Sequence, residues 1–134
     1  QAALAQSLAD AGIGYVHLKA LGGLRKGNTE SVNMGWKNKS FRNYADYMQT
    51  QEFVEGLAEL IRLGQEQVTA IMCAEAVPWR CHRSLVSDAL VVRGIKVMHI
   101  MGVGKANAHT LMSFAHVEGE GITYPQEAED GRQP

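Results

Sequence analysis

The sequence predicts an α/β fold, in which a mostly parallel sheet lies between two layers of helices. Three short apolar segments, 15–18, 68–72 and 95–100, have the composition of strands, and a continuous apolar run is typical of a strand buried on both faces. Segments with helical periodicity lie between and around them. Strands that alternate with helices favour a parallel sheet. We therefore expect a three-layer, Rossmann-like sandwich, with a further N-terminal strand missing before Gln1.

The helices are predicted from their apolar spacing and their end signals. Leu4, Leu8 and Ala11 share one face of a first helix, which Gly12 would end. A helical turn is expected over 44–48. Thr50 is a plausible N-cap for the next helix. The apolar face of that helix consists of Phe53, Leu57, Leu60, Ile61 and Gly64.

The second half of the chain contains a further helix and the last strand. Pro78 is a candidate first helical residue, Leu85 and Ala89 lie on one helical face, and Gly94 would end the helix. After the strand 95–100, Gly102 opens a loop, and 109–116 is predicted to form a last short helix.

The chain length of 134 residues indicates a single domain, and an apolar fraction of 46% is ample for its core. We assign the domain to 1–117, with a long basic loop at 19–42, and treat 118–134 as an acidic tail ordered only in part. No apolar window is long enough for a membrane span, and there is no signal-peptide pattern at the start. Two cysteines in an otherwise unstapled domain favour a reducing, cytoplasmic location.

The candidate site lies in 73–84, between an expected strand and an expected helix. In α/β sheets ligands bind at such junctions, and a helix start suits an anion. The candidate catalytic residues are Cys81, Glu75 and His82; the candidate ligand-binding residues are Arg83, Arg80, Cys73 and His99. Basic neighbours and a helix start would lower the pKa of the Cys81 thiol, and arginine forms planar paired contacts with phosphate. His99 would end a strand at the same sheet edge.

Each of these residues also has a purely structural interpretation. Cys73 could be a small buried apolar residue, and Glu75 or Asp88 could form an ion pair with Arg83. The cysteines lie eight positions apart in sequence, which differs from the short spacing of zinc knuckles. We therefore predict no metal and no cofactor.

The basic loop is a second, weaker candidate site. Cations interleaved with aromatic rings suit a single-stranded nucleic acid, although the aromatic residues could instead dock onto the core. The candidate residues are Arg25, Lys26, Trp36, Lys37, Lys39 and Arg42.

With these motifs in place, the chain resembles the bacterial family called domain of unknown function 488. The resemblance covers roughly 15–100 and is carried by Cys73-Ala74-Glu75 followed by Cys81-His82-Arg83-Ser84, by Leu21-Gly22-Gly23, and by Val97-Met98-His99-Ile100. It implies an α/β, Rossmann-like sandwich with a first strand upstream. It does not imply a reaction.

Together these observations predict a domain that binds a small anionic ligand at the 73–83 junction. The ligand would carry phosphate, as a nucleotide or nucleic acid does, and the Cys81, Glu75 and His82 set would act on it. A non-catalytic nucleic-acid module that uses 19–42, and a metal-binding or structural domain, are the alternatives.

Overall fold

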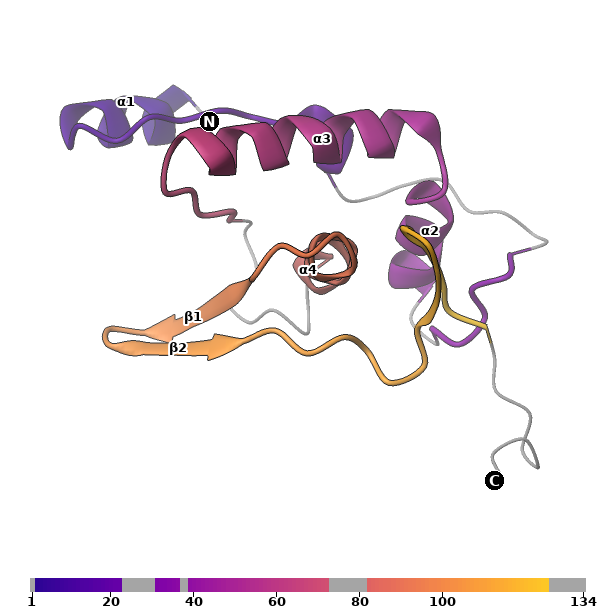
Figure 1. Ribbon diagram of the computed structural model, residues 1–134. Coiled ribbons are helices and arrows are strands. Elements are labelled where there is room, and N and C mark those ends of the chain that lie inside the picture. The colour runs from indigo at the N-terminus through magenta and orange to yellow at the C-terminus, as the bar shows by residue number, and fades with distance from the viewer. Residues whose placement is uncertain (1, 23–30, 37–38, 73–81, 126–134) are drawn as a thin grey trace.

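The computed structural model describes residues 2–22, 31–36, 39–72 and 82–125. The described helices are α1 (Ala2–Asp10), the 3-10 helix η1 (Lys19–Leu21), α2 (Lys39–Tyr47), α3 (Gln51–Glu66) and α4 (Arg83–Val92). The strands are β1 (Met98–Gly102), β2 (Lys105–Ala108), β3 (His116–Glu118) and β4 (Gly121–Thr123). In Figure 1, α1 and α3 lie along one side, α4 is seen end-on below α3, and the β1–β2 hairpin extends away from α4.

The prediction of a parallel sheet between two layers of helices is wrong for the described residues. They form two separate two-stranded antiparallel sheets, β1 with β2 and β3 with β4, and no parallel pair. Residues 15–18 and 68–72 form no strand. β1 is instead paired locally across a two-residue turn at 103–104, where Gly104 has a φ of +72° that favours glycine. An antiparallel partner strand such as β2 can follow β1 after a short turn, whereas a parallel partner strand requires a long crossover connection.

The helix ends predicted at Thr50, Gly12 and Gly94 are confirmed, whereas Pro78 lies outside the described residues. Thr50 caps α3, because its side chain accepts a hydrogen bond from the backbone N–H of Phe53 at 3.2 Å. Gly12 and Gly94 follow α1 and α4 with φ values of +78° and +83°. The segment 109–116, however, is not a helix, and α2 begins at Lys39 rather than near Tyr44.

The centre of the fold is α4. Every residue from Ser84 to Leu90 in this helix is buried. The buried face of α3, which includes Phe53, Leu57 and Leu60, contributes to the same core. A helix buried on nearly all sides places any polar residue that it carries inside the protein, where that residue needs hydrogen-bonding partners.

The β3–β4 hairpin belongs to this core, although its sequence was predicted to start a polar tail. Ile122 and Tyr124 are both buried. The backbone N–H of Gly35 donates to the Tyr124 carbonyl at 2.7 Å, and the Asn33 side-chain oxygen accepts from the Tyr124 N–H at 2.7 Å. Tyr124 is therefore bonded to Asn33 and Gly35, and its side chain is buried in the core.

Two glycines of α3 give a matched test of packing. A Cβ at Gly56 would lie 2.7 Å from the Cβ of Ala20, whereas a Cβ at Gly64 would meet nothing within 4 Å. Both alanine variants gain helix propensity, about 1 kcal/mol each. We expect Gly64→Ala to raise the free energy of unfolding, and Gly56→Ala to lower it by about 1–2 kcal/mol because α3 is pushed away from η1. Urea denaturation followed by circular dichroism measures both; equal stabilisation would contradict the close approach.

Candidate functional site

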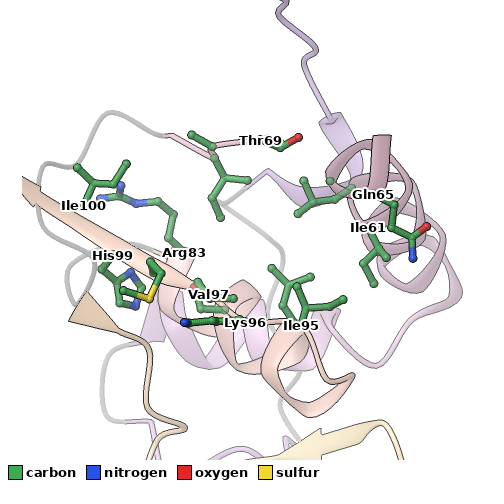
Figure 2. Close-up of a pocket in the computed structure, with 16 residues that line it drawn as sticks. Ile61, Gln65, Thr69, Arg83, Ile95, Lys96, Val97, His99 and Ile100 are labelled. Atoms are coloured by element: carbon green, nitrogen blue, oxygen red, sulfur yellow. The ribbon is translucent and has the colours of Figure 1, made fainter. Parts of the chain in front are cut away.

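A cavity of about 340 Å³ lies between α3, α4, residues 69–71 and residues 95–100. Most of its wall is aliphatic, with side chains from both helices and from the segment that leads into β1. Figure 2 shows Arg83, His99 and Ile100 at one end of this cavity and Ile61, Gln65 and Ile95 at the other. A volume of this size falls at the small end of the range of roughly 300–1,000 Å³ that is typical of small-molecule sites.

The polar groups of α4 that line the cavity are spaced one helical turn apart. Arg83 and Ser87 are at positions i and i+4 and share a face of the helix. Ser87 is only 1% exposed, and its hydroxyl makes no hydrogen bond with any described residue. Because buried hydroxyls are normally hydrogen-bonded, the Ser87 hydroxyl is suited to a polar group of a bound molecule.

A chain of three titratable side chains leads from the interior to this cavity. His109 Nε2 lies 2.6 Å from Asp88 Oδ1, and His109 Nδ1 lies 2.7 Å from His99 Nε2. The side chains of Asp88 and His109 are 0% and 6% exposed. His99 lines the cavity. We refer to Asp88, His109 and His99 together as the relay.

The carboxylate of Asp88 accepts further hydrogen bonds that fix its position. The Tyr124 hydroxyl donates to Oδ2 at 2.8 Å, and the backbone N–H of Met112 donates to Oδ1 at 3.3 Å. Burial raises the pKa of Asp88, and the hydrogen bonds from His109, Tyr124 and Met112 oppose that rise. Burial and the neighbouring Asp88 raise the pKa of Tyr124 as well, so the phenol keeps its proton and remains a donor.

When Asp88 is ionised, these contacts favour one pair of tautomers for the two histidines. With an ionised Asp88 as acceptor, His109 carries its proton on Nε2, and its Nδ1 accepts from the protonated Nε2 of His99. His99 then presents an unprotonated Nδ1. Burial, His109 and Arg83 lower the pKa of His99 from 6.5, which favours this neutral form.

The structure brings together two of the residues predicted from sequence and separates a third. Arg83 and His99 both line the cavity, and the charge of Arg83 acts on His99. His82 is not among the lining residues; its ring packs against Tyr44 with the ring centroids 4.8 Å apart. Cys73, Glu75, Arg80 and Cys81 lie outside the described residues, and their roles stay predictions.

The described part of the basic loop favours the alternative in which its aromatic residues dock onto the core. Trp36 is 8% exposed and packs against the rings of Phe41, Phe114 and Tyr124. Arg42 donates from Nε to the Trp36 carbonyl at 3.2 Å, and Lys39 is the exposed first residue of α2. Arg25, Lys26 and Lys37 lie outside the described residues. Trp36 therefore presents no open ring face on which a base could stack.

Sequence reasoning missed Asp88, His109 and Tyr124. The sequence suggested Asp88 only as an ion-pair partner of Arg83, placed His109 in an expected short helix, and placed Tyr124 in the tail. One signal was present: Asp88 interrupts the apolar run 85–92 of a helix, and a buried carboxylate requires donors. The sequence did not reveal which residues supply them.

Residues 2–22, 31–36, 39–72 and 82–125 contain no group of three or more histidine, cysteine, aspartate or glutamate side chains suited to a metal ion. Within the same ranges, no helix has the length and apolar character needed to cross a membrane.

Fold and site define a mixed α/β domain with a small, mainly aliphatic cavity and a histidine relay at one end. The chain belongs to the family described as domain of unknown function DUF488, whose model matches residues 1–90. This match includes α4 as far as Leu90, with Arg83, Ser87 and Asp88, and ends before His99, His109 and Tyr124. No curated protein and no solved structure matches the chain.

Proposed function

We propose that this domain binds a small organic phosphate in the cavity between α3 and α4. The phosphate would lie at the end formed by Arg83 and His99, and the organic body would lie along the aliphatic wall. The observation that carries this proposal is the placement of the Arg83 side chain at one end of an otherwise mainly aliphatic cavity of small-molecule size.

The chemistry of the lining supports an anion with an apolar body. A guanidinium recognises phosphate oxygens through paired N–H donors, and the Ser87 hydroxyl lies on the same face of α4. Lys96 adds a second cation to the rim. The opposite wall, which includes Leu60, Ile61 and Ile95, offers no charge. Apolar walls with a few converging polar groups are typical of small-molecule sites.

Adenosine 5′-monophosphate and adenosine are matched probes, because they differ in the phosphate alone. We expect the monophosphate to bind more tightly than adenosine, and Arg83→Ala to weaken its binding about 10- to 100-fold, as for a lost charged hydrogen bond of about 1.5–3 kcal/mol. Adenosine binding should change little. Isothermal titration calorimetry, or shifts of amide signals in NMR, measures both affinities.

Arg62→Ala is the control, since it removes the same charge at a surface site. Arg62 is half-exposed on α3 and pairs with Glu59 and Glu66. We expect this variant to bind the monophosphate like the parent. Equal binding of monophosphate and adenosine, or equal loss in the Arg62 and Arg83 variants, would overturn the proposal.

A further inference from the structure

We propose that His99 is a catalytic base of this cavity, held by Asp88 and His109 as positioning residues, and that the reaction is hydrolysis of a phosphate monoester. This inference rests on the proposed function, because it needs the phosphate at the Arg83 end. Its geometric basis is an unbroken chain of hydrogen bonds, at 2.6 and 2.7 Å, from a fully buried carboxylate to an imidazole on the cavity wall.

The buried end of the relay explains how the cavity end accepts a proton. When His99 Nδ1 gains a proton, the proton on its Nε2 can pass to His109 Nδ1. The positive charge then lies on His109, 2.6 Å from the carboxylate oxygen of Asp88. A carboxylate that stabilises an imidazolium is the arrangement by which a histidine base is supported in many hydrolases.

The other two donors on Asp88 make the carboxylate a fixed partner. One donor is the backbone N–H of Met112, in the segment after β2. The other is the hydroxyl of Tyr124, in the segment after β4. Two separate segments of the chain, together with α4 itself, therefore orient one side chain. An ion pair that served only to link two elements would not require a second imidazole that opens into a cavity.

The reaction is balanced by one water molecule. His99 Nδ1 takes a proton from water while the water oxygen bonds to phosphorus, and Arg83 neutralises charge on the phosphoryl oxygens. The bond between phosphorus and the ester oxygen breaks. The leaving oxygen lies opposite the attacking water and takes a proton from solvent. The relay releases its proton to solvent and returns to its starting state, so that monoester and water give alcohol and inorganic phosphate.

The first test is hydrolysis of 4-nitrophenyl phosphate, followed by release of 4-nitrophenolate. We expect slow turnover by the intact chain. His99→Gln should lower kcat about 100- to 1,000-fold, the size of a general-base contribution, with KM changed by less than about threefold because Arg83 remains. Gln keeps an amide that can donate to His109 but cannot accept the proton.

His116→Gln is the matched control. His116 is an exposed histidine in β3 whose neighbour is Glu118 at 3.5 Å, and it does not line the cavity. Its kcat should equal that of the parent. If the parent binds adenosine monophosphate but does not hydrolyse the ester, or if the His99 and His116 variants are equally active, this inference fails while the proposed function stands. If no phosphate binds, the proposed function fails as well.

The second test reads the relay directly, without a substrate. Ring nitrogen chemical shifts in NMR should show His99 and His109 as Nε2–H tautomers at pH 7.5, and His109→Gln should alter the His99 shifts. This variant should also lower kcat while KM is retained. An Nδ1–H tautomer at His99 would overturn the proposal, since that nitrogen would then have no lone pair for the proton.

The pH profile gives a third readout. His99 must be neutral to act, so kcat/KM should fall as the pH drops through the pKa of His99. The charged and titratable groups near it are Arg83 from α4 and His109 with Asp88 behind it, and Lys96 lines the same cavity. Because burial and the charges of His109 and Arg83 lower that pKa, the acid limb should lie below pH 6.5. A limb above pH 6.5 would contradict His99 as the base.

Discussion

Replacing Asp88 by alanine is expected to lower the free energy of unfolding by about 3–5 kcal/mol, because several buried donors lose their shared acceptor. The variant would leave three donors without an acceptor inside the core: His109 Nε2, the Tyr124 hydroxyl and the Met112 N–H. Each unpaired buried donor lowers the stability of the fold by about 1–3 kcal/mol before the structure relaxes. Urea denaturation of the parent and the variant measures the loss.

Asp88→Asn separates hydrogen bonding from charge in the same position. Its amide oxygen can still accept from His109 and Met112, and its NH₂ group can donate to the Tyr124 oxygen, so we expect a smaller loss than for alanine. Asp10→Ala is the surface control, because Asp10 is exposed and accepts only from Gln6 at 2.8 Å among the described residues. A loss below about 1 kcal/mol for Asp88→Ala would contradict the buried network.

Replacing Gly35 by alanine is expected to cost about 3 kcal/mol, at the upper end for overpacking. A Cβ at this position would lie 2.7 Å from the Pro125 carbonyl oxygen, 2.8 Å from the Tyr124 carbonyl oxygen and 2.9 Å from a ring carbon of Phe114. Two of these atoms belong to the backbone, and Gly35 N–H already donates to Tyr124. The added methyl therefore separates 31–36 from the segment after β4.

Gly14→Ala is the control for this change, since a Cβ there meets nothing within 4 Å. Chemical denaturation measures both variants. In the Gly35 variant we also expect faster amide hydrogen exchange at Tyr124, whose N–H is bonded to Asn33. Stabilities of the two alanine variants that agree within about 0.5 kcal/mol would show that the two segments are not in close contact.

The helices could be predicted because their signals are local. Thr50 and the Phe53–Leu57 spacing define α3 without reference to the rest of the chain, and Gly94 does the same for the end of α4. Strand pairing is not local. The run 68–72 has the composition of a buried strand, yet Val68 and Met72 are exposed and only Ile71 is packed against the core.

The sequence predicted two residues of the candidate site, Arg83 and His99, but it placed them together for the wrong structural reason. Arg83 and His99 were expected to meet at the carboxyl edge of a parallel sheet. They do line one cavity, but His99 reaches it from an antiparallel hairpin. The relay could not be predicted, because His109 and Tyr124 lie 21 and 36 positions after Asp88 in sequence and meet it only through the tertiary fold.

The length of the turn in the β1–β2 hairpin controls how the histidines of the site are placed. Its register pairs His99 with Asn107, and the backbone N–H of His109 donates to the Val97 carbonyl at 2.9 Å. Side chains alternate between the two faces of such a ribbon, so a shift of one residue reverses each of them. An insertion or deletion of a single residue at 103–104 would therefore turn one imidazole away from the other, although neither histidine is altered. Related chains that keep this chemistry should vary in hairpin composition but conserve the length of the turn.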